Sequence, residues 1–150
     1  MVGLAQGAFN KAVPYTYQRS QFGQPIGTFQ GLSFQFAQAY ADIEAARLLT
    51  YNAARRKEEG RDFAREAAIA KLVASQVAQS VSGAAVEWMG GVGFTRETGV
   101  EKFWRDSKIV SFHSSPCQLQ FMLYHQGAIY EGTSNIQLQT IAKFIQKQYS

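Results

Sequence analysis

A single carboxylate, Glu131, stands between an aromatic residue, Tyr130, and Gly132, just before a predicted helix start at Ser134. Burial against apolar neighbours raises the pKa of a glutamate, which makes its carboxylate a better proton acceptor. Gly132 leaves room for a substrate, and the helix start offers free backbone N–H donors. The helix dipole alone also favours an acidic residue at this place. The spacing therefore leaves a general base and a purely structural glutamate both open.

A second group of candidates is the run of glycines at 90, 91 and 93, which follows Trp88. Glycines after a helix let another backbone or a phosphate-bearing cofactor come close, although they also serve as an ordinary helix end and turn. No strand precedes them, so they are not a dinucleotide-binding fingerprint of the Rossmann type. Arg19 lies in a predicted loop, where it is either a solvated side chain or a phosphate ligand.

A metal site is the third possibility, with His113, Cys117 and His125 as ligands. Their spacing fits no zinc signature, and a nucleophilic pair of Cys117 with His113 has no better support. We therefore expect no metal site. Cys117 is the one cysteine of the chain, which excludes an intramolecular disulfide.

Composition limits the remaining classes of function. The chain has 150 residues, of which 46% are hydrophobic and 17% charged, as expected for one folded domain. The net charge is +4, from 15 basic and 11 acidic side chains of mixed order, so we expect no nucleic-acid binding. No apolar run approaches the ~18 residues of a membrane span, and Lys11 follows rather than precedes the first apolar stretch, unlike a signal peptide.

Apolar periodicity predicts helices that position these candidates. We expect helices over 2–18 and 29–60, a loop over 19–28, and a third helix that Asp62 caps and that ends at the glycine run. Apolar residues repeat at alternating spacings of four and three, the ~3.5-residue period of bundle packing. The predicted seams are Leu32, Phe36, Ala39, Ile43, Ala46 and Thr50, and then Phe63, Ala67, Ala70, Ala74, Val77, Val81, Ala84 and Trp88.

The end of the chain completes the predicted fold. One or two short helices are expected over 96–109, and Ser134 with Gln137 has the spacing of a capping box that opens a final helix. The expected apolar face of that helix is Ile136, Ile141, Phe144, Ile145 and Tyr149. The sequence thus predicts an all-α protein, an antiparallel up-and-down bundle of the four-helix type, as a single domain over 1–150.

Several motifs in fixed order resemble the acyl-CoA dehydrogenase family, and most closely its short/branched-chain members. The matching blocks are Arg19–Gly23, Glu44–Tyr51, Glu87–Phe94, Arg105–Ile109 and Ile129–Gln137. The resemblance implies the family's C-terminal helical domain, without the N-terminal helical and middle β domains that carry much of the flavin and acyl-CoA site.

The resemblance also implies a chemistry: FAD-dependent oxidation of a short or 2-methyl-branched acyl-CoA to a 2-enoyl-CoA. Glu131 matches the base that removes the α-proton, and Gly132 matches a substrate contact. The residues that match FAD contacts are Arg19, Gln21, Phe22, Gln30, Glu87, Trp88, Met89, Gly90, Gly91, Thr133, Ser134 and Asn135.

The family further implies electron-transferring flavoprotein as acceptor, a homotetramer, and a place in the mitochondrial matrix in the catabolism of fatty acids and branched-chain amino acids. The isolated chain is expected to be inactive. The alternative is a non-catalytic helical fragment that packs only with itself or with full-length subunits.

Residues 110–126 depart from the family pattern. This stretch contains no Asp, Glu, Lys or Arg, yet it holds both histidines and the cysteine. Without it, Lys108 and Ile109 would run directly into Gly127 and the Glu131 motif. Val110-Ser111 can be encoded as a splice donor and Gln126 as an acceptor, so we expect an anomalous insertion, a translated intron.

Overall fold

A computed structural model describes residues 1–108 and 134–149. In these residues the chain forms the helices α1 (Val2–Gln18), α2 (Gln30–Glu58), α3 (Ala64–Met89), α4 (Val100–Lys108) and α6 (Ser134–Tyr149). The loop between α1 and α2 holds a minimal hairpin, β1 (Ser20–Gln21) with β2 (Gln24–Pro25), and the 3-10 turn η1 (Ile26–Thr28). A second such turn, η2 (Gly90–Val92), follows α3. The predicted all-α class is confirmed.

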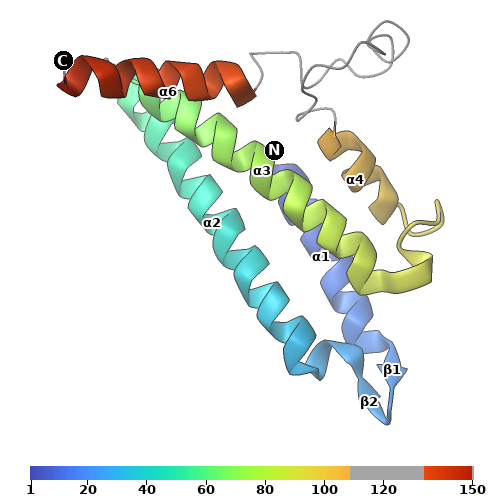
Figure 1. The fold of residues 1–150 in the computed structure, drawn as a ribbon. Coiled ribbons are helices and arrows are strands. Elements are labelled where there is room, and N and C mark those ends of the chain that lie inside the picture. The colour runs from blue at the N-terminus through green and yellow to red at the C-terminus, as the bar shows by residue number, and fades with distance from the viewer. Residues whose placement is uncertain (109–133, 150) are drawn as a thin grey trace, which may run out of the picture.

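Helices α1, α2 and α3 run side by side with alternating direction, and the hairpin lies at the end where α1 turns into α2 (Figure 1). Helix α4 packs against α1 and α3, and α6 packs against α3. Helix α3 therefore touches α1, α2, α4 and α6, so it is the centre of the bundle (Figure 1). None of the helices in the described part of the chain is long and apolar enough to cross a membrane.

The core forms because small residues let these helices approach closely. Helix α1 buries Ala5, Ala8 and Ala12 completely, and the large side chains Phe36 and Trp88 fill the space between α2 and α3. Their rings meet edge to face with centroids 4.8 Å apart, a favoured aromatic geometry. This contact lies toward the hairpin end of the bundle, so the aromatic core supports the candidate residues there.

The predicted seams are right over most of their length and wrong at the two ends that lie next to the turn between α2 and α3. On α2, Thr50 is exposed and donates a hydrogen bond to the carbonyl of Ala46 at 2.8 Å, and Ala53 is buried instead. Phe63 is 36% exposed because it precedes α3, and the ammonium of Lys57 lies 5.9 Å above its ring. The central position of α3 adds buried residues that a one-sided seam omits: Ala68, Ser75, Ala78, Ser82, Ala85 and Met89.

The turn from α2 to α3 follows its predicted signals, with a shift of one residue. Gly60 has a φ of +68°, its N–H donates to Lys57, and the N–H of Arg61 donates to Arg56. These two bonds form the Schellman motif that ends many helices. The predicted cap of α3, Asp62, lies one residue before the N-cap Phe63, and its carboxylate accepts the N–H of Ala64 at 3.2 Å.

Helix α6 begins at Ser134, the predicted cap residue, but the apolar face expected for it is largely unburied. Ile136 is 50% exposed, Ile145 53% and Tyr149 81%, whereas Gln137 is buried. Within the described part of the chain, the main packing contact of α6 is with α3, and one such neighbour leaves much of a face that wide exposed.

Candidate functional site at the hairpin end of the bundle

The site begins with the hairpin that follows α1. Ser20 pairs with Pro25 and Gln21 with Gln24, which leaves Phe22 and Gly23 as a two-residue turn. Both have positive φ, +53° and +81°, as the hairpin turns that match strand twist require. Positive φ is unusual for phenylalanine, and the Phe22 side chain is 95% exposed. An aromatic ring is therefore presented at the hairpin tip, where only Phe29 contacts it edge to face among the described rings.

Arg19 joins this hairpin to the glycine turn after α3. Its backbone N–H closes α1 on the carbonyl of Tyr15 at 2.9 Å, and its carbonyl accepts the N–H of Ile26 at 2.9 Å. Its guanidinium donates to the Tyr15 hydroxyl at 3.5 Å and lies 3.6 Å from where a side chain on Gly90 would begin. The structure thus brings together Arg19 and Gly90, which are 71 residues apart in the chain.

Each glycine of this turn is accommodated for a different physical reason. Gly90 has a φ of +64°, a conformation that glycine adopts without strain. Gly91 is exposed, and apart from its chain neighbours no atom of the described residues lies within 4 Å of the place where its side chain would be. Gly93 is buried, and a Cβ there would overlap the carbonyl oxygen of Val86. Gly93 therefore closes the turn onto α3, whereas Gly90 and Gly91 leave the backbone open toward Arg19.

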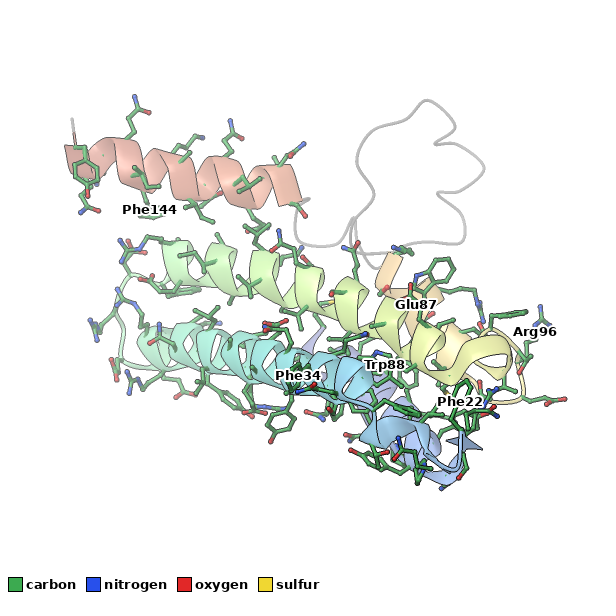
Figure 2. All side chains as sticks on the ribbon, turned by 60° about the horizontal axis from the view of Figure 1, so that its bottom comes forward. Phe22, Phe34, Glu87, Trp88, Arg96 and Phe144 are labelled. Carbon is green, nitrogen blue, oxygen red and sulfur yellow. The ribbon has the colours of Figure 1, made fainter. Side chains whose placement is uncertain are left out.

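The residues before the glycines divide between surface and core. Glu87 is exposed, but Trp88 and Met89 are 3% and 4% exposed. The indole of Trp88 contacts Phe36 and Phe9 edge to face. Figure 2 shows Phe22, Glu87, Trp88 and Arg96 toward one end of the bundle, far from Phe144 on α6. The side chains of Trp88 and Met89 thus hold the turn in place, and its main chain faces outward.

This arrangement suits a particular kind of ligand. A guanidinium binds phosphate with charge-assisted hydrogen bonds, and a side-chain-free turn beside it lets a bulky phosphate approach the main chain. The exposed ring of Phe22 offers a flat apolar surface for a planar group at the same end. The Tyr15 contact was missed in the sequence, although its spacing of four from Arg19 on a helix was the available signal.

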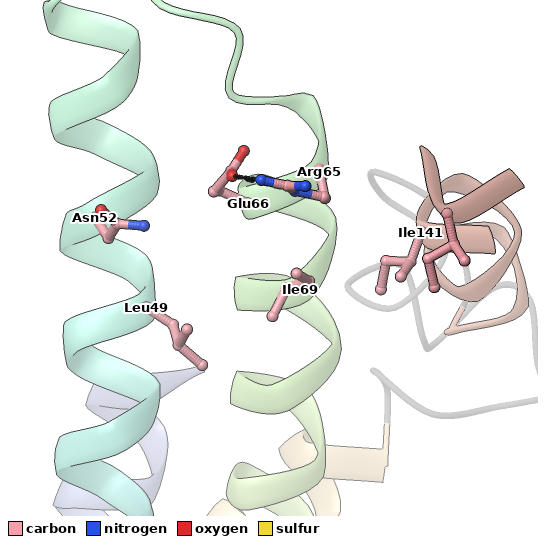
Figure 3. A pocket seen from close by; sticks show the side chains of 7 residues that line it. Leu49, Asn52, Arg65, Glu66, Ile69 and Ile141 are labelled. Carbon is pink, nitrogen blue, oxygen red and sulfur yellow. Dashed lines mark hydrogen bonds and ion pairs between the residues drawn. The ribbon is translucent and has the colours of Figure 1, made fainter. Parts of the chain in front are cut away.

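A cleft at the opposite end offers no comparable chemistry. It has a volume of about 390 Å³ between α2, α3 and α6, and Leu49, Ile69 and Ile141 line it (Figure 3). Its polar rim is the ion pair of Glu66 with Arg65 at 2.9 Å. Desolvation alone would raise the pKa of Glu66, but the hydrogen bond from Arg65 and the nearby charges hold the pKa below its ordinary value. A carboxylate held in this way is a poor proton acceptor.

The other predicted site residues have separate positions. Gln21 and Gln30 are exposed at the hairpin end, Gln30 as the first residue of α2. Ser134 and Asn135 begin α6 and are not brought to Arg19 (Figure 1). The predicted residues Glu131, Gly132 and Thr133 lie outside the described residues, as do His113, Cys117 and His125. Among the described residues, no group of three or more possible metal ligands occurs.

Residues 1–114 match the family model for the acyl-CoA dehydrogenase C-terminal domain. The chain belongs to the acyl-CoA dehydrogenase family. The match ends within the anomalous stretch 110–126. It includes the hairpin, α2, α3 and the glycine turn, so all elements of the described site fall within this acyl-CoA dehydrogenase domain.

Individual relatives agree with the family. The chain is 52% identical over 150 residues to the probable short/branched chain specific acyl-CoA dehydrogenase of Dictyostelium discoideum, covering 100% of this chain and 32% of that protein. It is 52% identical over 149 residues to the mitochondrial short/branched chain specific acyl-CoA dehydrogenase of Rattus norvegicus, covering 99% and 31%. Butyryl-CoA dehydrogenase from Megasphaera elsdenii has the same fold, with a TM-score of 0.82 at 41% identity, covering 97% and 33%. The chain therefore spans about a third of the length of these acyl-CoA dehydrogenases.

Proposed function

We propose that this chain supplies the C-terminal domain of an FAD-dependent dehydrogenase that oxidises short or 2-methyl-branched acyl-CoA to 2-enoyl-CoA. The observation that carries this proposal is the juxtaposition of Arg19 with the open turn at Gly90 and Gly91, within a chain 52% identical to two short/branched-chain enzymes. The chain's own residues fit one part of a dinucleotide: a guanidinium and a bare turn for phosphate, and an exposed ring for a planar group.

When bound, FAD supplies the hydride acceptor for the reaction. In the proposal, Arg19 binds the pyrophosphate, the main chain of Glu87–Gly91 approaches the cofactor, and Gln21, Phe22 and Gln30 complete this surface. Thr133, Ser134 and Asn135 form a second contact region. In the proposal, the two regions serve different cofactor molecules of the homotetramer that the family resemblance implies, and the position of Ser134 and Asn135 away from Arg19 agrees with this division.

Glu131 is the proposed base. The α-proton of a thioester is a very weak acid, so a carboxylate removes it only where the resulting charge is stabilised and the β-hydrogen leaves as hydride. Gly132 leaves room for the acyl chain beside that carboxylate. The complete enzyme passes its electrons to electron-transferring flavoprotein and works in the mitochondrial matrix; the rat relative bears a mitochondrial name.

The test supplies the remaining two thirds of the molecule from a relative. A chimera in which this chain, without residues 110–126, replaces the matching part of the rat enzyme is purified, and its flavin content is measured. We expect a yellow protein whose flavin absorbance is bleached anaerobically by 2-methyl-branched acyl-CoA. A folded chimera that binds FAD but is not bleached by any short acyl-CoA would refute the proposed activity.

The alternative function is a helical fragment without catalysis, which associates only with itself or with full-length subunits. The exposed apolar residues of α6, Ile136, Leu138 and Ile145, favour such association. A colourless helical oligomer from the 150-residue chain, together with an inactive chimera, would favour this alternative over the enzyme.

A further inference from the structure

One side chain, Gln35, connects two segments of the proposed flavin site although it belongs to neither. Its amide oxygen accepts the indole N–H of Trp88 at 2.9 Å, and its amide nitrogen donates to the carbonyl of Gly31 at 2.9 Å. Gly31 follows Gln30 at the start of α2, and Trp88 precedes the Gly90 turn. Gln35 thus links the two segments through one amide group.

The indole at one end of this link has little freedom. Trp88 is 3% exposed, and Phe36 and Phe9 hold its ring edge to face, with centroids 4.8 Å and 6.1 Å away. A donor buried in this way needs an acceptor, because an unpaired buried N–H loses its hydrogen bonds to water without replacement. Gln35 itself is exposed, so without its oxygen the indole N–H must turn toward water or another acceptor.

A movement of Trp88 reaches the site within two residues. Met89 is itself buried, and Gly90 then reverses the chain with a φ of +64°, directly beside the guanidinium of Arg19. The main chain between Trp88 and Gly90 has little freedom to adjust, because the side chains of Trp88 and Met89 are both buried in the core. The position of the turn relative to α2 therefore depends on where the indole is held.

We infer that Gln35 is a positioning residue of the flavin site: through Trp88 it sets the Glu87–Gly91 turn relative to the start of α2, without touching the cofactor. The inference rests on the proposed flavin role of that turn. Gln35 acts on the position of the turn, and it affects FAD affinity only through that position.

The experiment compares three variants of the 150-residue chain and of the chimera. Gln35→Met keeps the side-chain length but removes the acceptor, and Gln35→Glu keeps an acceptor oxygen but loses the amide donor. The control is Gln38→Met, because Gln38 lies on the same helix and donates an exposed hydrogen bond to Asp42 at 2.9 Å, away from Trp88. The readouts are the NMR signals of the Trp88 indole and of the Gly90 and Gly91 amides in the chain, and FAD titration of the chimera.

We expect Gln35→Met to shift all three signals and to weaken FAD binding about tenfold, whereas Gln38→Met stays within about threefold of wild type. Gln35→Glu, which keeps the acceptor for Trp88 but loses the donor to Gly31, should give an effect between these two. Gln35→Met would overturn the inference if it lowered the melting temperature but left the glycine signals unchanged. Unchanged FAD affinity despite shifted signals would equally overturn it. If the parent chimera takes up no FAD at all, the proposed function fails, and the glycine signals of the chain still decide whether Gln35 positions the turn.

Discussion

At the scale of single residues, two glycines of one turn allow the cost of a steric overlap to be measured apart from the cost of backbone strain. Gly93 has an ordinary φ of −64°, so only the overlap of a Cβ with Val86 forbids a side chain there. Gly91 has open space instead. We expect Gly93→Ala to destabilise the chain by about 2 kcal/mol, because the turn must move away from α3. Chemical denaturation followed by circular dichroism measures this difference.

The matched control is Gly91→Ala, which changes the same residue type two positions away. We expect its unfolding free energy to stay within about 0.5 kcal/mol of wild type. Equal losses of unfolding free energy in both variants would show that the destabilisation comes from the turn as a whole and not from the contact with Val86. Our description of Gly93 would then be wrong.

Residue types and spacing predicted the glycine turn, but not that Arg19 lies beside it. From residue types and spacing alone, Arg19 and the glycine run are two separate candidates, because they lie far apart in the sequence. Their meeting depends on the parallel packing of α1 and α3, which brings the C-terminal ends of both helices together and which only tertiary structure supplies. Trp88 was predicted both as a seam residue and as a cofactor contact, and its side chain takes the first of these places.

At the scale of elements, helix positions followed from periodicity and end signals. Gly60 ended α2 as predicted, because its positive φ and the two turn hydrogen bonds are local. The burial of α6 was not predictable in the same way, because an apolar face on a helix does not say whether its own chain or another covers it. The extra burial on α3 likewise depends on how many neighbours that helix has.

The junction of α2 and α3 should be sensitive to acid. Glu66 is largely buried beside Arg65 and also lies 3.5 Å from Arg56 of α2, and its pKa is held below the ordinary value. Because the folded state binds this proton more weakly than the unfolded state, the stabilisation is complete above the ordinary glutamate pKa of about 4.3. It is lost as the pH falls through the lowered pKa.

We therefore expect Glu66→Gln to cost about 1 kcal/mol of unfolding free energy at pH 7, and the gap to wild type to close below about pH 4. Glu59→Gln is the control, since Glu59 pairs with Arg55 and Arg61 on the surface, where ion pairs contribute little. Thermal unfolding between pH 3 and 7 gives both curves. A gap for Glu66→Gln that is constant over this range would contradict the electrostatic explanation.

At the scale of the whole molecule, the uncharged stretch 110–126 is the part that fits the family pattern least. It contains the apolar, proline-free run from Leu119 to Tyr124, which favours pairing between chains. We expect a variant that joins Ile109 directly to Gly127 to be more soluble and to unfold more sharply. Light scattering and calorimetry on both chains measure these properties.

The proposed intron origin of residues 110–126 can be tested in the gene sequence. A GT donor at Val110 and an AG acceptor at Gln126 are expected, and transcripts without the stretch should exist. A deletion variant that no longer folds, or a gene without these boundaries, would contradict the proposal that residues 110–126 are foreign to the domain.

The proposed function requires this domain to carry the base of a flavin-dependent dehydrogenation, and Glu131→Gln in the chimera removes that base. Glutamine has nearly the shape of glutamate but cannot accept the α-proton, so acyl-CoA binding should survive while proton removal fails. Stopped-flow absorbance measures flavin reduction after mixing with substrate. We predict that the reduction rate falls by at least about 10³-fold with FAD content unchanged. Bleaching at the unchanged rate would place the base elsewhere and refute the proposed role of Glu131.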